Sequence, residues 1–429
     1  MSVNTRILYI PEPETKRIVI VGGGFGGLKL ALKLRKLNFQ IVLIDRNNYH
    51  LFQPLLYQVA MSGLEPSAIS FPLRKVLQDT HIHFRMAELE AVHPESNEIL
   101  TDIGVLRYDF LILATGAKTN FFGNEAIEKN SLQMKSAPDA LFIRNRILRN
   151  FEKALNKATK EDISTYLNVA IIGGGPTGVE LAGAVAEMRK YVLPKDYPEL
   201  DMGNMKIMLF EASPRLLAGM SQEASITARK YLEELGVEVR TGTAVLNYDD
   251  RVLSLPNNET INVKNVIWAA GITSTRIEGI SELSYGRNNR LLVNRFNQVE
   301  GYSTIFAIGD NCLMTEEAFP NGHPQVAQVA LQQAKLLSGN ISGITKNKPL
   351  KPFHYRDKGS LATVGRHLAV ADLPIGKFKG YFAWLLWSIV HLLSIVGVKN
   401  KLFILLDWTW KYITYDQALR LLIKHKARA

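Results

Sequence analysis

The chain has 429 residues, of which 47% are hydrophobic and 21% charged, and its formal net charge at neutral pH is +11. This length and apolar content are sufficient for two or three domains, each with a full core. The single cysteine, Cys312, excludes a disulfide framework, and polar residues lead directly into the first apolar segment. We therefore expect no secretory signal and a protein of a reducing compartment.

The first predicted unit is a buried strand, Arg17–Val21, followed by a glycine-rich turn at residues 22–27 and a helix over residues 26–36. Such a turn lets the backbone approach a pyrophosphate, whose charge is held by the helix N-terminus. The next predicted strand, residues 39–45, ends in an aspartate that can bond a ribose hydroxyl. We predict a dinucleotide site formed by Gly22, Gly24, Gly26, Gly27 and Asp45.

A second copy of this pattern follows about 150 residues later. The predicted strand at residues 168–172 leads into the glycines of residues 173–178 and a helix over residues 177–190. The strand at residues 206–211 ends in Glu211, which would repel a 2′-phosphate and therefore favours NADH over NADPH, although Arg215 lies close in sequence. We predict a second dinucleotide site formed by Gly173, Gly175, Gly178 and Glu211. Two such sites suggest a bound flavin and a nicotinamide that reduces it.

Three short apolar strands end in a glycine. They occupy residues 110–116, 266–271 and 303–310, and the last ends in Gly309-Asp310. In flavoproteins with two dinucleotides this late strand returns to the first domain, where its carboxylate bonds the flavin ribityl chain and the following helix points at the phosphates. A turn or helix-cap aspartate is the alternative. From these strand ends we predict contacts with the cofactors for Thr115, Gly116, Gly271, Gly309 and Asp310.

The lone cysteine limits the chemistry. Disulfide reductases and sulfide-oxidising quinone reductases of this architecture use redox cysteines, whereas Cys312 is expected to be a small buried residue at a helix start. Electrons must then leave the flavin directly, and no metal site is expected.

The C-terminal region combines apolar and basic residues. Residues 381–398 contain no Asp, Glu, Lys or Arg, and from Lys377 onward there are nine basic and two acidic residues. A membrane-spanning helix, a buried core helix and helices lying in the membrane interface are the three interpretations. Tryptophans beside basic residues favour attachment to an anionic lipid surface, and a dimer interface can use the same apolar face.

The chain resembles the type II NADH:quinone oxidoreductases, which are single-subunit, non-proton-pumping NADH dehydrogenases. The resemblance extends over nearly the whole length. It is carried by YHLFQPLLYQVA at residues 49–60, GGGPTGVE at 173–180, PQVAQVALQQ at 324–333, and by GYFAW, KNKL and WKYITY at 380–384, 399–402 and 410–415. The glutamine segment and the C-terminal segments are more specific than either glycine turn.

The resemblance implies roles for further residues. Gln328 and Gln332 would face a quinone beside the flavin, with Ala327 in the same motif, or would form an ordinary solvated helix face. Glu180 would lie near the flavin and either tune the flavin or relay a proton, or it would be a first-turn residue that only complements the helix dipole. Gln53 would approach the flavin, or would only fix a loop. His50 would bond the cofactor or a loop carbonyl.

The resemblance also implies the fold and the activity. We expect an α/β protein with two Rossmann-like dinucleotide-binding domains in a glutathione-reductase-like arrangement, plus an amphipathic helical membrane anchor. The expected domains are residues 1–120 and 291–350 for FAD, 121–290 for NADH and 351–429 for anchoring and dimerisation. Two electrons would pass from NADH through FAD to a membrane quinone of the respiratory chain, on the cytoplasmic face of the cell membrane.

Two other functions stay open at this point. A basic flavoprotein of this kind can be an NADH-sensing binding protein like apoptosis-inducing factor, but the clustering of charge with Trp and Leu favours lipid over nucleic acid. A soluble ferredoxin or rubredoxin reductase is the other alternative, and such an enzyme needs no apolar C-terminal segment.

Overall fold

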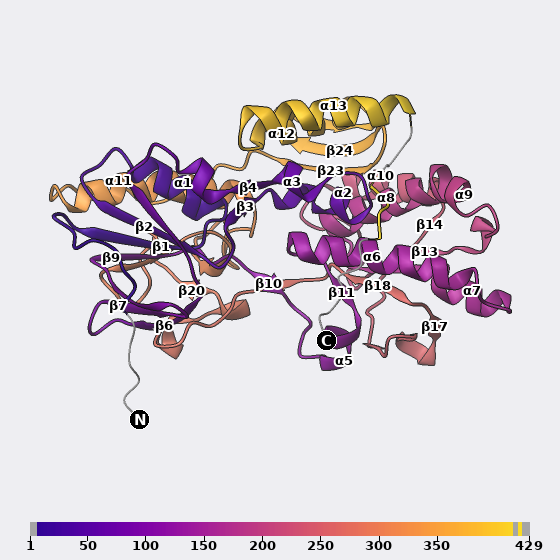
Figure 1. Cartoon of the computed structure of the whole chain (residues 1–429), viewed down its shortest axis with the longest axis horizontal. Coiled ribbons are helices and arrows are strands. Elements are labelled where there is room, and N and C mark those ends of the chain that lie inside the picture. Colours follow the sequence, from indigo (N-terminus) through magenta and orange to yellow (C-terminus); the bar gives the residue numbers. More distant parts are fainter. Residues whose placement is uncertain (1–6, 415–418, 423–429) are drawn as a thin grey trace. The chain divides into compact units, whose positions relative to one another are not determined.

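The computed structural model describes residues 7–414 and 419–422. The chain forms two compact units, which are described separately. The first unit contains the described residues of 1–51, 71–118 and 272–357, and the second contains those of 52–70, 119–271 and 358–429. Figure 1 shows the elements of both units.

The first unit is built on a parallel five-stranded sheet. Its strands lie in the order β21 (Ile305–Ala307), β9 (Phe110–Leu113), β1 (Arg17–Val21), β2 (Gln40–Asp45) and β5 (Ile82–Met86). Successive side chains of β1 point to opposite faces of the sheet, and each face belongs to a different hydrophobic core. Ile18 and Ile20 pack with α1 (Phe25–Leu34) and α11 (Ala327–Ile344), which lie side by side in Figure 1. Val19 and Val21 pack with the antiparallel sheet of β6 (Leu89–His93), β7 (Glu98–Thr101) and β8 (Gly104–Arg107).

Residues 272–290 belong to the first unit, which differs from the predicted boundary at residue 290. The backbone N–H of Val92 in β6 donates to the Glu278 carbonyl at 2.8 Å, and Ile277 and Ile280 enter the same core as β6. These long-range contacts leave no signal in the local sequence pattern.

The second unit repeats the parallel sheet. Its strands lie in the order β11 (Leu132–Gln133), β18 (Asn265–Trp268), β12 (Val169–Ile172), β13 (Ile207–Glu211) and β14 (Val237–Thr241). The helices α6 (Ala137–Ala154), α8 (Pro176–Tyr191) and α10 (Gln222–Glu234) belong to this unit. The strand and helix expected around each glycine turn are thus present, with bounds within a few residues of the prediction.

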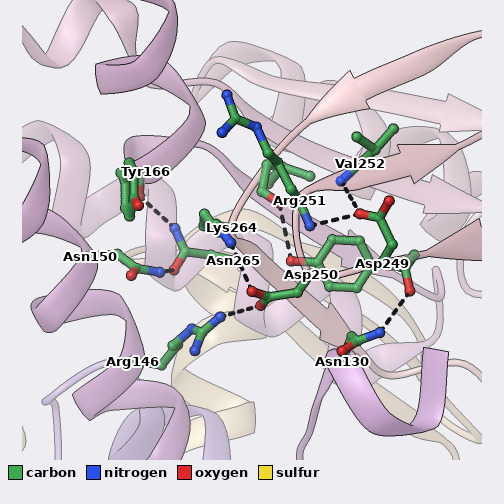
Figure 2. Close-up of polar contacts among 12 residues, drawn as sticks. Asn130, Arg146, Asn150, Tyr166, Asp249, Asp250, Arg251, Val252, Lys264 and Asn265 are labelled. Carbon is green, nitrogen blue, oxygen red and sulfur yellow. Dashed lines mark hydrogen bonds and ion pairs between the residues drawn. The ribbon is translucent and has the colours of Figure 1, made fainter. Parts of the chain in front are cut away.

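A polar cluster joins α6 to the sheet of the second unit (Figure 2). The buried Asn265 side chain accepts a hydrogen bond from Asn150 at 2.7 Å and donates to the Tyr166 carbonyl at 2.8 Å. It also donates to the Asn168 carbonyl at 2.9 Å. Beside it, Asp250 pairs with Arg146 and, at 2.7 Å, with Lys264. Each polar atom that Asn265 contributes is therefore satisfied inside the fold.

The C-terminal part of the second unit consists of the sheet β23 (Ser360–Gly365), β24 (Leu368–Leu373) and β25 (Gly376–Lys379), followed by α12 (Gly380–Ser394) and α13 (Val398–Thr414). A Cβ atom at Gly183 of α8 would lie 1.6 Å from the Val364 carbonyl oxygen, so α8 packs directly on β23. The Ser221 hydroxyl at the start of α10 also donates to Asp372 of β24 at 2.9 Å. Of the predicted anchoring region, residues 351–429, the described residues from 358 onward are therefore part of the second compact unit, and residues 351–357 belong to the first.

Short elements complete both units. The helices are α2 (Leu56–Ala60), α3 (Pro66–Ile69), α4 (Leu73–Val76), α5 (Glu125–Asn130), α7 (Lys160–Leu167) and α9 (Leu193–Asp196). The strands are β3 (Tyr49–Leu51), β4 (Ser70–Pro72), β10 (Lys118–Thr119), β15 (Asn247–Tyr248), β16 (Val252–Ser254), β17 (Thr260–Asn262), β19 (Ile272–Thr273), β20 (Leu291–Leu292) and β22 (Cys312–Leu313).

Candidate functional site

The glycine turn of the first unit is tightly packed on one side and open on the other. Gly22 has φ +108°, and a Cβ there would lie 2.2 Å from the Ala114 carbonyl oxygen. A Cβ at Gly27 would lie 1.9 Å from the Gly22 carbonyl oxygen, whereas a Cβ at Gly24 would meet no atom within 4 Å. Gly24 is the N-cap of α1 and makes no side-chain cap. This open helix N-terminus fits the pyrophosphate of a dinucleotide.

Asp45 and His50 hold this turn in place. One Asp45 oxygen accepts from the Gly23 N–H at 2.6 Å and the other from the Asn47 N–H at 2.7 Å. The Nδ1 of the buried His50 lies 2.9 Å from the Gly23 carbonyl oxygen, so of its two expected roles His50 takes the loop carbonyl. Burial lowers the pKa of His50, which keeps the ring neutral and suited to donate this bond.

The Gly309-Asp310 segment follows β21 as predicted, but two expectations about the next residues were wrong. Residues Gly309–Asn311 form a single 3₁₀ turn and Cys312 lies in the short strand β22, not at a helix start. The helix expected directly after Asp310 is also absent there, since α11 begins only at Ala327. The intervening loop contains His323, whose Nε2 lies 2.7 Å from Glu316.

Gln333 is a functional candidate that the sequence analysis missed. Its fully buried side chain accepts from the Gly309 N–H at 2.7 Å and contacts the Cys312 sulfur at 3.2 Å. Gln325 donates to the Asp310 carbonyl at 2.8 Å. Together these glutamines fix the loop that presents Asp310. The sequence does carry a signal for this position. Gln333 lies four residues from each of the apolar residues Val329 and Leu337, and this helical spacing puts it on the inner face of α11.

Thr115 and Gly116 follow β9 in the same unit. Gly116 has φ +72° and a Cβ there would meet no atom within 4 Å. Gly309 has φ +80°, and a Cβ there would lie 3.3 Å from Ala330 of α11. The glycine turn, the Asp310 loop and the end of β9 all belong to the first unit, and the sheet order β21-β9-β1 brings the ends of these strands to one edge. This arrangement fits the elongated FAD molecule.

The glycine turn of the second unit has the same construction. Gly173 has φ +114°, a Cβ at Gly178 would lie 1.8 Å from the Gly173 carbonyl oxygen, and Gly175 is open. Glu211 accepts from the Gly174 N–H at 2.5 Å and from the Ser213 N–H at 2.7 Å. The Arg215 guanidinium instead donates to the carbonyls of Ala218 and Met220, at 2.7 and 2.9 Å. Arg215 is thus engaged with its own loop.

Gly271 lies shortly after the end of strand β18 in this unit. It has φ +73°, and a Cβ there would lie 2.7 Å from the Phe122 ring. The Trp268 indole nearby donates to the Asn120 carbonyl at 2.9 Å. A side chain at position 271 would displace Phe122, so the glycine has a packing reason as well as the predicted cofactor role.

Glu180 lies in the second turn of α8 and is buried. Burial raises the pKa of its carboxyl group to about 8, and hydrogen bonding from the Thr363 backbone and the Trp387 side chain only partly opposes this rise. It lines a cavity of about 140 Å³ together with Tyr57 and Trp387. A solvated first-turn glutamate that only complements the helix dipole would be exposed, so the burial favours a functional role.

Gln328 and Gln332 lie on α11 of the first unit, one turn apart as predicted. The Gln328 amide donates to Asp357 at 3.2 Å. The Gln332 amide donates to the Arg356 carbonyl at 2.9 Å and accepts from the Arg356 N–H at 3.0 Å. A quinone contact with Gln332 would therefore replace one of these bonds. Ala327 is the first residue of the same helix.

Gln53 begins a 3₁₀ turn, Gln53–Leu55, which leads into α2 of the second unit. Its side chain is exposed, while its neighbours Phe52 and Leu55 are buried. Its contact with the flavin stays a prediction.

The two C-terminal helices expose apolar stripes. On α12 the exposed residues recur with helical spacing at Phe382, Leu385, Ile389 and Leu393. On α13 the stripe consists of Phe403, Leu406, Trp410 and Ile413, each more than half exposed. None of the helices in the described residues has the length and hydropathy needed to cross a membrane.

Cys312 is buried and its sulfur accepts a hydrogen bond from the Gln333 amide. Burial raises the pKa of the Cys312 thiol to about 11. It is therefore a poor nucleophile. Among the residues that the structure describes, no group of three or more His, Cys, Asp or Glu side chains is placed to bind a metal ion.

Comparisons with known proteins identify the family of this chain. Residues 16–334 match the pyridine nucleotide-disulphide oxidoreductase family and residues 358–414 match the NDH2 C-terminal domain. The type II NADH:quinone oxidoreductase Ndh of Mycobacterium tuberculosis is 34% identical over 94% of this chain and 89% of its own length. The external NADH-ubiquinone oxidoreductase 2 of Saccharomyces cerevisiae mitochondria is 28% identical, with 93% and 81% covered. The structure of NDH2 from Plasmodium falciparum in complex with NADH has a TM-score of 0.88 at 24% identity, covering 96% of this chain and 100% of that one.

Proposed function

This chain belongs to the type II NADH:quinone oxidoreductases, and we propose that it transfers two electrons from NADH, through bound FAD, to a membrane quinone. The observation that carries the proposal is the pair of glycine turns, each closed on one side by an acidic residue and open at the N-cap of its helix. FAD, when bound, supplies the two-electron chemistry, and the protein supplies binding and orientation.

The residues that hold FAD are those of the first unit. Gly22, Gly24, Gly26 and Gly27 receive the pyrophosphate at α1, and Asp45 stands at the end of β2 for the ribose. The Asp310 loop, fixed by Gln333 and Gln325, and the end of β9 at Thr115 and Gly116 complete the set.

The residues that hold NADH are Gly173, Gly175, Gly178 and Glu211, with Gly271 at the neighbouring strand end. The open Gly175 leaves room for the pyrophosphate, and the negative charge of Glu211 disfavours the 2′-phosphate of NADPH. The Arg215 guanidinium donates to carbonyls of its own loop, and its engagement there supports the same preference for NADH over NADPH.

The reduction of quinone needs hydrogen-bonding groups and a proton. Gln328, from the glutamine motif, is the candidate for a quinone carbonyl, and Gln332 and Ala327 shape the same helix. Glu180 is the candidate proton donor, because a carboxyl group with a pKa of about 8 holds its proton at neutral pH and can release it.

Attachment to the membrane is assigned to α12 and α13. Their apolar stripes would enter the acyl boundary, and the basic residues Lys377, Lys379 and Lys399 would contact anionic headgroups. The proposal places the protein on the cytoplasmic face of the cell membrane as a peripheral homodimer that feeds the respiratory chain. No protons are pumped, as the resemblance implies, so NADH oxidation by the protein in sealed liposomes generates no proton gradient.

Steady-state kinetics test the proposed function. The purified protein should oxidise NADH when a short-chain quinone is added. Gln328→Ala should raise the KM for quinone or lower its turnover, and should leave the reduction of the flavin by NADH unchanged. An absence of quinone-dependent NADH oxidation by the wild-type protein would refute the proposal.

A further inference from the structure

The cavity beside Glu180 lies wholly within the second unit. Its volume of about 140 Å³ is large enough for several water molecules, because one water needs roughly 10–15 Å³ by this measure. The walls come from α2, α8, β23, α12 and α13. Their polar groups include Tyr57, Gln58, Glu180, Glu187 and Trp387.

The buried residues that line the cavity include polar groups with spare hydrogen-bonding capacity. The Tyr57 hydroxyl accepts from Gln58 at 3.0 Å, and among the described residues no side chain or carbonyl accepts its proton. Trp387 is buried, and its Nε1 lies close enough to Glu180 to oppose part of the rise in that pKa but makes no hydrogen bond of standard geometry within the described part of the chain. Buried polar groups of this kind bind ordered water.

A second carboxylate, Glu187, also lines the cavity. It lies seven residues after Glu180 on α8, which is two helical turns and about 10 Å along the axis, on the same helix face. Glu187 accepts a hydrogen bond from the Arg366 backbone N–H. Glu187 itself is partly exposed, whereas Glu180, Tyr57 and Thr363, which line the same cavity, are buried.

The charged and titratable groups around Glu187 come from four elements. They are Lys190 and Tyr191 on α8, Arg366 after β23, Lys411 and Tyr412 on α13, and Tyr57 on α2. Burial raises the pKa of the Glu187 carboxyl group, and the neighbouring Arg366 and Lys190 partly offset this rise. Glu187 therefore shares a helix face with the buried Glu180 and lies beside two basic side chains, the partly exposed Arg366 and the exposed Lys190.

We propose that Glu187 relays protons from solvent, through water in this cavity, to Glu180. The inference rests on the proposed function, in which NADH, one proton and quinone give NAD⁺ and quinol, so that each turnover consumes one solvent proton. Glu180 gives up that proton, and Glu187 returns one to it through the cavity water. Glu187 acts through Glu180 and is a positioning and relay residue.

A purely structural role for Glu187 makes a different prediction. Its hydrogen bond to the Arg366 N–H needs only an acceptor oxygen, which glutamine also has. Glu187→Gln would therefore preserve a structural contact and remove only the ability to exchange a proton. Glu234→Gln is the matched control, because Glu234 lies on α10 of the same unit, half-exposed and 3.8 Å from Lys230, and does not line the cavity.

The kinetic test compares two acceptors. Ferricyanide takes electrons without protons, whereas a short-chain quinone takes both. Glu187→Gln should lower quinone turnover by about tenfold or more, with the larger loss at alkaline pH, and should leave ferricyanide turnover at the wild-type level. Small weak acids such as acetic acid should restore part of the quinone activity. Equal loss with both acceptors, or no loss with either, would overturn the relay.

A second test does not depend on activity. After a rapid change of pH, the infrared carbonyl band of the protonated Glu180 carboxyl group, identified by its absence in Glu180→Gln, should relax about tenfold more slowly in Glu187→Gln than in wild type or Glu234→Gln. Relaxation at the wild-type rate would contradict the proposal. If the wild-type protein failed to reduce quinone, the proposed function would fall, and this infrared experiment would still decide whether Glu187 controls proton access to Glu180.

Discussion

The carboxylate of Glu211 accepts a hydrogen bond from the backbone N–H of Gly174 at 2.5 Å. The end of β13 is thereby tied to the glycine turn before α8, and a negative charge is held where a nucleotide ribose would lie. Asp45 makes the same bond to Gly23 in the first unit, at 2.6 Å. The two units thus use the same device, with a glutamate in one and an aspartate in the other.

Glu211→Gln should weaken the preference for NADH over NADPH. Glutamine can still accept from Gly174 but no longer repels a 2′-phosphate. We expect the ratio of kcat/KM for NADPH to kcat/KM for NADH to rise by about tenfold, equivalent to about 1.4 kcal/mol. Glu223→Gln, an exposed position on α10, is the control. An unchanged ratio would show that Glu211 does not face the ribose.

Gly27→Ala and Gly24→Ala should fail in different ways. A methyl group at position 27 would lie 1.9 Å from the Gly22 carbonyl oxygen, so this variant should lose about 1–3 kcal/mol of stability and be purified without flavin. A methyl group at position 24 meets no protein atom, so this variant should melt like wild type and bind FAD more weakly. Thermal melting and flavin absorbance measure both effects. Full flavin content in Gly24→Ala would argue against a pyrophosphate at this N-cap.

Asn265→Ala should destabilise the second unit. The substitution leaves the Tyr166 carbonyl and the Asn150 amide without their buried partner (Figure 2), and the Asn168 carbonyl loses the same partner. We expect a loss of about 2–3 kcal/mol and a melting temperature lower by about 5 °C or more. Asn262→Ala, whose side chain bonds Glu161 at the surface, should change the melting temperature little. Similar melting of the two variants would contradict the role given to Asn265.

The pH dependence of quinone reduction should reflect Glu180. A carboxyl group whose pKa is raised to about 8 is protonated below that pH and loses its proton above it. Turnover with quinone should therefore fall as the pH rises through about 8, and turnover with ferricyanide should not. Glu180→Gln should lower quinone turnover by about 100-fold and remove this step from the pH profile. A profile that keeps the step in Glu180→Gln would assign it to another group.

Binding to lipid vesicles should depend on the apolar stripe of α13. Leu406→Gln combined with Ile413→Gln removes two exposed apolar side chains, each worth about 1.5–3 kcal/mol when buried in an apolar medium. We expect vesicle affinity to fall by about 100-fold in a sedimentation assay with anionic vesicles. The control pair, Ile226→Gln and Leu246→Gln, is also exposed but lies outside α12 and α13. Equal binding by the two double variants would exclude α13 as the anchor.

The parts of the site that were predictable from the sequence are those set by local pattern. The glycine turns, their flanking strands and helices, and the acidic residues Asp45 and Glu211 follow from short-range spacing, and the structure places them as expected. The turn geometry itself requires glycine at Gly22 and Gly173, where φ is positive.

The parts that were not predictable depend on contacts between distant segments. Helical spacing can place Gln333 on the inner face of α11, but no local pattern reveals that Gln333 fixes the Gly309 loop or that Glu187 borders a cavity. The hydrogen bond from Trp408 to Gln58, at 2.9 Å, joins residues 350 positions apart. The wrongly expected helix after Asp310 has a similar cause, because a strand ending in Gly-Asp does not specify how long a loop follows it.

The most direct test of the central claim is anaerobic and uses the purified protein with its flavin bound. Addition of one equivalent of NADH should bleach the flavin absorbance, and a short-chain quinone should then restore it with formation of one quinol for each NADH consumed. A protein that binds no flavin, or a flavin that NADH bleaches and quinone leaves bleached, would contradict the account.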